Sequence, residues 1–261
     1  MPVLGARYNP CGLNKKHRFT AMGLALLGLL GTGVSALAED SSQSQGILDP
    51  AGPNAQHISD LWYIVLIPAM IVLVGVGGAL IYIAFKYRRK DENFMPKQIG
   101  GNNALEFTWT LIPAMVLMGI FVLTVLQTGF LRNSPTPDAM RIKVIGQQWA
   151  WSYQYEDPNS KKLVTTLGTM YIPAGKVVNI DLESKDVIHS FSVPRLAGRL
   201  DAVPGHHNTM WLQADEPGTY YGQCTEFCGL SHAAMTVTVK ALSQKDFDAW
   251  YSQMKQKLGG S

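Results

Sequence analysis

Two long apolar stretches constrain this chain more than any other feature of its sequence. Residues 61–85 and residues 107–130 are almost free of charge, and Pro68 and several glycines are the main interruptions of the first. Each stretch exceeds the roughly 20 apolar residues that a helix needs to cross a hydrocarbon layer about 30 Å thick. The sequence therefore predicts a transmembrane helical hairpin over residues 61–131.

The loop between the two stretches, residues 86–105, predicts how the hairpin is oriented. It holds a cluster of cations, whereas the outer flanks contribute little beyond Arg132. The cations are Lys86, Arg88, Arg89, Lys90 and Lys97. Short loops rich in Lys and Arg stay in the cytoplasm. We therefore expect a multi-pass protein of the inner (cytoplasmic) membrane of a bacterium, with the rest of the mature chain facing the periplasm.

The first 60 residues have the composition of an export segment and a linker. Residues 1–38 combine a basic region, an apolar run over residues 21–34 and the small residues of Ala36-Leu37-Ala38, which is typical of a cleaved signal peptide. An uncleaved first membrane helix is the alternative. Cys11 lies in this segment. Residues 39–60 are read as a polar linker, because residues 39–53 have no apolar periodicity.

Beyond a Ser/Pro-rich linker at residues 132–139, the pattern changes to short β-rich runs separated by turns. This pattern over residues 140–242 predicts a Greek-key β-sandwich. Ser243 followed by Asp246 is typical of a helix N-cap, which predicts a packing helix within residues 243–261. The fold class is therefore membrane α plus all-β.

The soft donors of the chain gather in one short segment. Cys224, Cys228, His232 and Met235 follow one another within twelve residues, and His189 lies about thirty-five residues upstream. Thiolate, imidazole and thioether ligands select copper, zinc or iron–sulfur. Structural zinc usually takes two short Cys/His pairs, and a mononuclear blue-copper site uses one Cys. Two thiolates that bridge two copper ions use every donor, and a disulfide is the other interpretation of the cysteine pair.

These donors and their flanks, Asp186-Val187-Ile188-His189-Ser190 and Tyr220-Tyr221-Gly222-Gln223-Cys224, resemble the dinuclear copper A site of cytochrome c oxidase subunit 2. The resemblance runs from the first membrane span onward and implies a cupredoxin-type sandwich. It also implies a role for each ligand: Cys224 and Cys228 bridge both coppers, His189 and His232 bind one each, and Met235 and the carbonyl of Glu226 are weak ligands.

The same resemblance extends to three further positions. Glu106, in the segment Glu106-Phe107-Thr108-Trp109-Thr110, matches a carboxylate at the mouth of a proton pathway. Trp149 matches the tryptophan that accepts electrons from cytochrome c. The carboxylate of Glu226 matches a ligand of a magnesium ion shared with the catalytic subunit, and Asp201 lies in a segment expected near that boundary.

Two features of the sequence qualify this match. Without the family, the run from Trp149 to Tyr153 alternates as a half-buried strand. Gln147, Gln154 and Lys185 also depart from residues that are common in the family. These departures reduce the acidic surface expected to dock a basic soluble cytochrome.

The resemblance implies a subunit of a proton-translocating oxidase. It takes electrons from a c-type cytochrome through copper A and passes them to haem in subunit 1, the catalytic subunit, with subunit 3 as a further partner and membrane lipid around the spans. The alternatives are a copper A subunit of a nitric oxide reductase, a metal-free cupredoxin of quinol-oxidase type and a membrane-tethered copper carrier. A nucleic-acid partner is excluded because the net charge is only +3 and the cations are scattered or lie beside the apolar spans. His206 and His207 are read as surface histidines.

Overall fold

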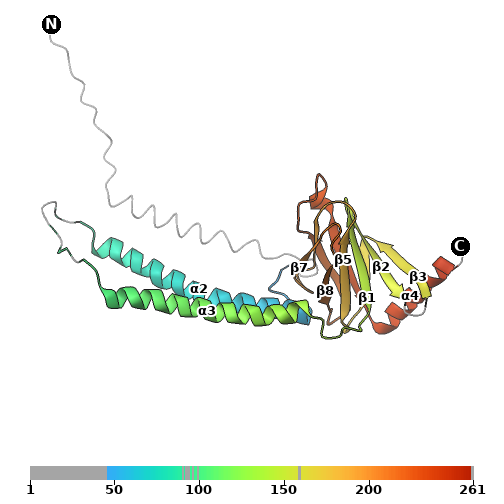
Figure 1. Ribbon diagram of the computed structural model, residues 1–261, viewed down its shortest axis with the longest axis horizontal. Helices are drawn as coiled ribbons and strands as arrows, with labels where there is room; N and C mark the ends of the chain where they lie inside the picture. Colours follow the sequence, from blue (N-terminus) through green and yellow to red (C-terminus); the bar gives the residue numbers. More distant parts are fainter. Residues whose placement is uncertain are drawn as a thin grey trace, which may run out of the picture. The chain divides into compact units, whose positions relative to one another are not determined.

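The computed structural model describes residues 46–89, 91, 95, 97–98, 100–157 and 160–259. The predicted signal peptide at residues 1–38, with Cys11, lies outside the described residues, as does the first part of the predicted linker. From Gly46 onward, the chain forms two long helices, a β domain and a final helix (Figure 1).

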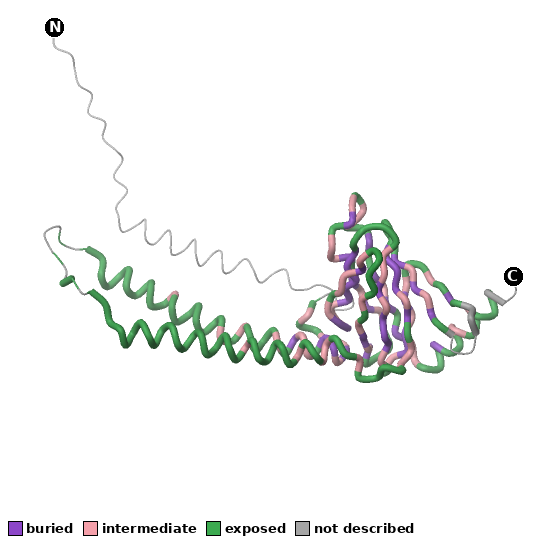
Figure 2. The backbone as a smooth tube through the Cα atoms, viewed as in Figure 1, coloured by how far each residue is buried: buried purple, intermediate pink, exposed green. Residues whose placement is uncertain are grey.

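Helices α2 (Pro53–Lys86) and α3 (Asn103–Arg132) form the hairpin. Both are long and apolar enough to cross a membrane, and the most apolar part of each is not buried within the protein. Figure 2 shows that most of both helices is exposed. The predicted hairpin is confirmed, and each helix extends beyond its apolar stretch. Pro68 and Pro113 lie within the helices without ending them.

The start of α2 corrects the predicted linker boundary, since residues 53–60 are helical rather than part of a linker. Pro53 lies in the first turn, where the lack of an N–H costs no helical hydrogen bond. Asn54 is buried and donates from Nδ2 to the carbonyl of Trp211 (3.1 Å). Just before the helix, the Ala51 N–H donates to the carbonyl of Arg195 (2.7 Å). Contacts with the β domain therefore order this polar segment, and such contacts leave no periodic pattern in the sequence.

The β domain contains two five-stranded sheets, ordered β3-β2-β1-β5-β8 and β4-β10-β9-β6-β7. Most neighbours are antiparallel, whereas β1 pairs with β5 and β10 with β4 in parallel. The strands are β1 (Arg141–Gln147), β2 (Ala150–Asp157), β3 (Ser160–Leu167), β4 (Thr169–Pro173), β5 (Val178–Ser184), β6 (His189–Ser192), β7 (Arg199–Ala202), β8 (Asn208–Leu212), β9 (Gly218–Cys224) and β10 (Thr236–Leu242). The chain passes repeatedly from one sheet to the other, which confirms the predicted β-sandwich.

The core of the sandwich lies between the two sheets. Trp151, Tyr153 and Tyr155 occupy alternate positions of β2 and are completely buried, as period-two alternation requires of an inward face. The core cluster continues to Cys224 and Cys228. The soft donors are therefore attached to the rigid part of the molecule.

Helix α4 (Gln244–Gly259) closes the chain as predicted. The hydroxyl of Ser243 accepts from the Asp246 N–H (3.2 Å) and donates to the Asp246 carboxylate (2.6 Å), which is the predicted N-cap. Phe247 is buried, and Trp250 stacks on Tyr171 with 4.4 Å between ring centroids. This helix covers the core, and the predicted packing role is confirmed.

Candidate metal centre

Strand register brings the upstream histidine to the cysteine loop. Strand β6 pairs with β9 so that Phe191 lies opposite Cys224, and His189 begins β6 two residues earlier. The Thr225 N–H then donates to the Ser190 carbonyl (3.1 Å), which continues this pairing past the end of β9. His189 and Cys224 are therefore neighbours across two strands, although thirty-five positions separate them in the sequence.

The cysteine loop is closed at its base by the sheet. The Cys224 N–H donates to the Met235 carbonyl (2.9 Å), and the β9–β10 ladder begins directly below at Gln223 and Thr236. The sulfur atoms of Cys224 and Cys228 lie 3.9 Å apart, and Met235 Sδ lies 3.8 Å from Cys228 Sγ. A disulfide needs a separation of about 2.05 Å, so these cysteines are two separate thiols.

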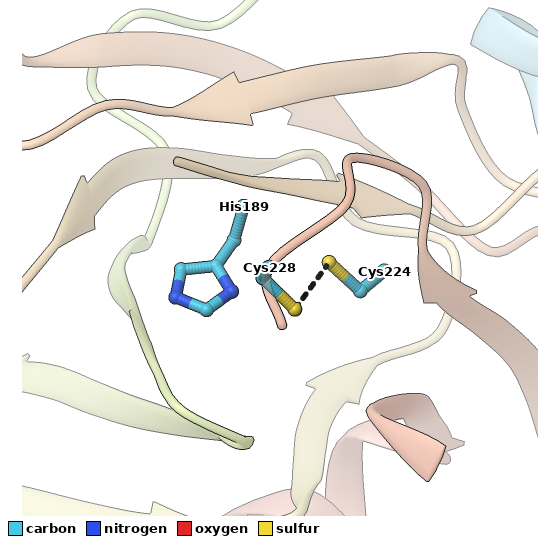
Figure 3. Close-up of side chains that lie close together, drawn as sticks. All are labelled: His189, Cys224 and Cys228. Carbon is cyan, nitrogen blue, oxygen red and sulfur yellow. Dashed lines mark hydrogen bonds between the residues drawn. The ribbon is translucent and has the colours of Figure 1, made fainter. Parts of the chain in front are cut away.

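Figure 3 shows the imidazole of His189 beside the two thiols. Ligand atoms of His189, Cys224 and Cys228 all lie within 4.8 Å of one another, and all three side chains are buried. His232, on the 3-10 turn η2 (His232–Ala234), places Nδ1 3.5 Å from Cys228 Sγ. The carbonyl of Glu226 lies 3.3 Å from Cys224 Sγ. The structure thus brings together all six of the predicted ligand positions.

One ring nitrogen of His189 has a hydrogen-bond partner, and the other has none within the described residues. Nε2 lies 2.8 Å from the Asp186 carboxylate, which also accepts from the backbone N–H groups of Gln148 and Val187 (both 2.7 Å). Within the described residues, buried Nδ1 has no hydrogen-bond partner. A carboxylate that binds one ring nitrogen and leaves the other to face a metal is the usual support of a histidine ligand.

The turn between β1 and β2 supports the cysteine loop from the opposite sheet. Gln148 Nε2 (2.8 Å) and Trp149 Nε1 (3.1 Å) both donate to the carbonyl of Cys228. Trp149 is not part of a strand, because Gln147 pairs with Ala150 and leaves Trp149 in the turn. The strand interpretation therefore holds for Trp151 and Tyr153 and is wrong for Trp149, whose side chain is 38% exposed.

The titration of the nearby groups follows from burial and hydrogen bonding. Burial, together with the neighbouring Cys224 thiol and the Asp186 carboxylate, raises the pKa of the Cys228 thiol to about 11. Burial also disfavours the charged form of Asp186, but its hydrogen bonds from Gln148, His189 and Val187 outweigh burial and lower its pKa. Metal binding must therefore displace a proton from Cys228.

The donor set fits copper. Within the part of the chain that the structure describes, a buried imidazole nitrogen without a hydrogen-bond partner lies near a pair of buried thiols, with a thioether sulfur and a second imidazole next to them. Soft ligands of this kind suit copper, and the thioether is a ligand that a structural zinc site does not need. The residues present thus match the composition expected of a copper A site.

The other predicted residues lie elsewhere. Glu106 is in the first turn of α3, where its carboxylate accepts from the N–H of the N-cap residue Asn102 (3.3 Å). The carboxylate of Glu226 lies 3.7 Å from Arg199, which also lies 3.8 Å from Asp201. His207 is exposed and pairs with Glu183. Neither Glu106 nor the Glu226 carboxylate is among the metal-ligand group of His189, Cys224 and Cys228.

Sequence reasoning missed the roles of Asp186 and Gln148. The carboxylate of Asp186 is committed to His189 and to two backbone N–H groups. The spacing of Asp186 and His189, three residues apart, is the only local feature that indicates this pair. Gln148 lies eighty positions from Cys228, so no local pattern indicates their contact.

Comparison with known proteins places these features in one family. The family model "Cytochrome C oxidase subunit II, transmembrane domain" matches residues 40–125, and "Cytochrome C oxidase subunit II, periplasmic domain" matches residues 159–242. The chain is 42% identical over 217 residues to cytochrome c oxidase subunit 2 of Alkalihalophilus pseudofirmus, covering 81% of this chain and 62% of that relative's length.

Two other matches differ in coverage. Cytochrome c oxidase subunit 2 of Arabidopsis thaliana is 32% identical over 229 residues, which is 79% of this chain and 88% of that protein. The crystal structure of the periplasmic domain of subunit II of cytochrome oxidase from Bradyrhizobium japonicum is 33% identical, with a TM-score of 0.43, and covers 47% of this chain and 98% of that one.

Proposed function

The chain belongs to the cytochrome c oxidase subunit II family, the copper-bearing subunits through which electrons enter the oxidase, and from this premise we propose the roles of its individual residues. It is a membrane protein with two spanning helices and a periplasmic domain. The observation that carries the proposal is the convergence of His189, Cys224 and Cys228 in a buried cluster within 4.8 Å.

The proposed cofactor is the dinuclear copper A centre, which when bound supplies one-electron transfer with little change in geometry. The thiolates of Cys224 and Cys228 would hold the ions, together with the imidazoles of His189 and His232 through Nδ1. Met235 and the Glu226 carbonyl would complete the ligand set as weak ligands. Support comes from the burial of the thiols and of Nδ1, which excludes water from the ligands.

The proposed point of electron acceptance is Trp149, and the proposed donor is a c-type cytochrome. Its indole is partly exposed, and Nε1 donates to the carbonyl of a ligand residue, Cys228. The side chain therefore lies between solvent and the metal loop. Exposed Val187 and Ile188 add apolar area beside the same turn, which favours a docking contact that depends little on charge.

Two further roles are proposed for contacts with the catalytic subunit 1. The Glu226 carboxylate, a hard oxygen donor, contributes to a magnesium site shared with that subunit. Glu106, in the first turn of α3 beside the loop of residues 87–102, admits protons to the catalytic subunit. Subunit 3 and membrane lipid are the other proposed partners, and the bacterial inner membrane is the proposed location. The cations Lys86, Arg88 and Arg89 at the same end of the hairpin support a cytoplasmic loop.

Electron paramagnetic resonance of the full-length, copper-loaded protein in detergent tests the central proposal. We expect one unpaired electron shared by two copper nuclei. Cys224→Ser removes one of the two thiolates and should give a spectrum of a single copper. Met254→Leu, a conservative change in α4 outside the proposed ligand set, should leave the shared spectrum unchanged. A single-copper spectrum from the unaltered chain would contradict the proposal.

A further inference from the structure

Gln148 contacts both sides of the metal centre, and it does so with different atoms. Its side-chain Nε2 donates to the carbonyl of Cys228 (2.8 Å), and its backbone N–H donates to the carboxylate of Asp186 (2.7 Å). The other oxygen of that carboxylate binds His189 Nε2 (2.8 Å). A continuous chain of hydrogen bonds therefore connects a histidine ligand with a thiolate ligand through two residues that bind no metal.

This connection joins the two sheets of the sandwich. Gln148 lies in the turn between β1 and β2 of one sheet, and His189 and the cysteine loop belong to the other. Asp186 lies in the segment that crosses from β5 to β6. The distance between His189 and Cys228 is thus fixed across the sandwich as well as along β6 and β9.

The backbone near Gln148 is shaped to permit these contacts. Gly229 has a φ of +117°, which disfavours any side chain, and a Cβ there would lie 3.1 Å from Gln148 Nε2 and 3.3 Å from the Trp149 ring. The glycine after Cys228 therefore lets both donors reach the Cys228 carbonyl. Gln147, one position before Gln148, is also exposed but has no side-chain hydrogen bond within the described residues.

We propose that Gln148 is a positioning residue for the copper centre, one that sets the spacing of His189 and Cys228 by holding the Cys228 carbonyl and the Asp186 carboxylate together. The proposal rests on the ligand roles given above for Cys228 and His189. Trp149 holds the same carbonyl and offers the electron a route to it, whereas Gln148 acts only through the ligands.

The test uses the full-length chain in detergent with Gln148→Ala and the matched control Gln147→Ala. Copper affinity is measured by competition with a chelator, and the electron paramagnetic resonance spectrum reports how evenly the two ions share the electron. We expect Gln148→Ala to lose about 10-fold in copper affinity, the lower end for partners of metal ligands, and to share the electron unevenly. Gln147→Ala should match the unaltered chain in both measurements.

A double-mutant cycle tests whether Gln148 positions the copper ligands together with Asp186 or stabilises the cysteine loop independently of it. Asp186→Asn keeps one acceptor oxygen and loses the other, so it breaks the same chain of hydrogen bonds at its second link. If the two residues act as one unit, the affinity loss of the double variant is smaller than the product of the single losses.

Three results would overturn the positioning role. They are a Gln148→Ala variant identical to Gln147→Ala, one that lowers only the unfolding temperature, and single losses that multiply in the double variant. A failure of the unaltered chain to show two coupled coppers would instead overturn the proposed function, and the positioning role with it.

Discussion

The two sides of the metal centre are built differently. His189 is completely buried at the start of a strand, its ring is fixed by Asp186, and Trp151 packs edge-on against it with 5.8 Å between ring centroids. His232 is partly exposed on a single 3-10 turn, and within the described residues no carboxylate pairs with it. One ligand is therefore held by the fold and the other mainly by the loop that carries it.

This difference assigns two requirements of a metal site, a rigid set of ligands and a loop that can admit the metal, to different sides of the centre. Sheet pairing and core packing define the geometry of the strand side, so we expect it to change little when a metal binds. The loop side, from Thr225 to Met235, is fixed at its two ends and by the contacts of Cys228, and it exposes Phe227 and Leu230. We infer that the strand side preorganises the centre and that the loop side adjusts when the metal enters.

The largest expected effect comes from removing each histidine in turn. His189→Ala leaves a buried cavity and a carboxylate without its imidazole, so it should lower the free energy of unfolding of the metal-free protein by about 2–4 kcal/mol. His232→Ala should lower it by less than about 1 kcal/mol, as for most partly exposed positions. Denaturant unfolding of the metal-free chains measures both. Both variants should lose the two-copper spectrum, and equal destabilisation by the two would refute the contrast between the sides.

A smaller steric change at the strand side removes none of the donor side chains. A Cβ on Gly146 would lie 2.9 Å from Cδ2 of His189 and 3.1 Å from the Trp151 ring. Gly146→Ala should therefore displace the imidazole and cost about 1–3 kcal/mol of unfolding free energy, as overpacking does in a dense core. Gly218→Ala is the control, because a Cβ there meets only ordinary contacts beyond 3.5 Å. If Gly146→Ala were as mild as this control, the strand side would be less rigid than we infer.

The same contrast explains which features the sequence could predict. The loop donors are close in sequence, so spacing alone identified Cys224, Cys228, His232 and Met235, and hydropathy identified the hairpin. The support of His189 was not predicted, because the hydrogen bond from Asp186, three residues away, leaves no clear pattern in the sequence, and Gln148 reaches Asp186 only through the turn between β1 and β2. Trp149 was misread as a strand residue by alternation, since a two-residue turn interrupts the pattern just there. The start of α2 was missed because its polar first turn is ordered by a contact with Trp211, and the residue Ala51 just before it by a contact with Arg195.

Met235 lies where the loop joins the sheet, and a substitution there tests whether its contribution to core packing can be separated from its proposed role as a copper ligand. Its side chain is buried with Sδ 3.8 Å from Cys228 Sγ. Met235→Leu preserves volume, so it should cost no more than about 1 kcal/mol in unfolding free energy. Because this change removes only the proposed weak thioether ligand, the two-copper spectrum should persist. The reduction potential of the copper centre should change, and voltammetry measures it. Met254→Leu should alter neither property, and loss of the shared spectrum in Met235→Leu would assign Met235 a larger role than a weak ligand.

The smallest expected effect concerns the outer edge of the loop side. Arg199 donates to the carbonyl of Thr225 (3.3 Å) and lies 3.7 Å from the Glu226 carboxylate, but its side chain is 55% exposed. Water can replace such contacts, so Arg199→Ala should change the unfolding free energy by less than about 1 kcal/mol. Arg141→Ala, which breaks the exposed pair with Asp181, is the matched control. Chelator competition should give both variants the copper affinity of the unaltered chain. A clear loss of affinity in Arg199→Ala alone would mean that the loop is braced from outside, and the loop side would then be preorganised as the strand side is.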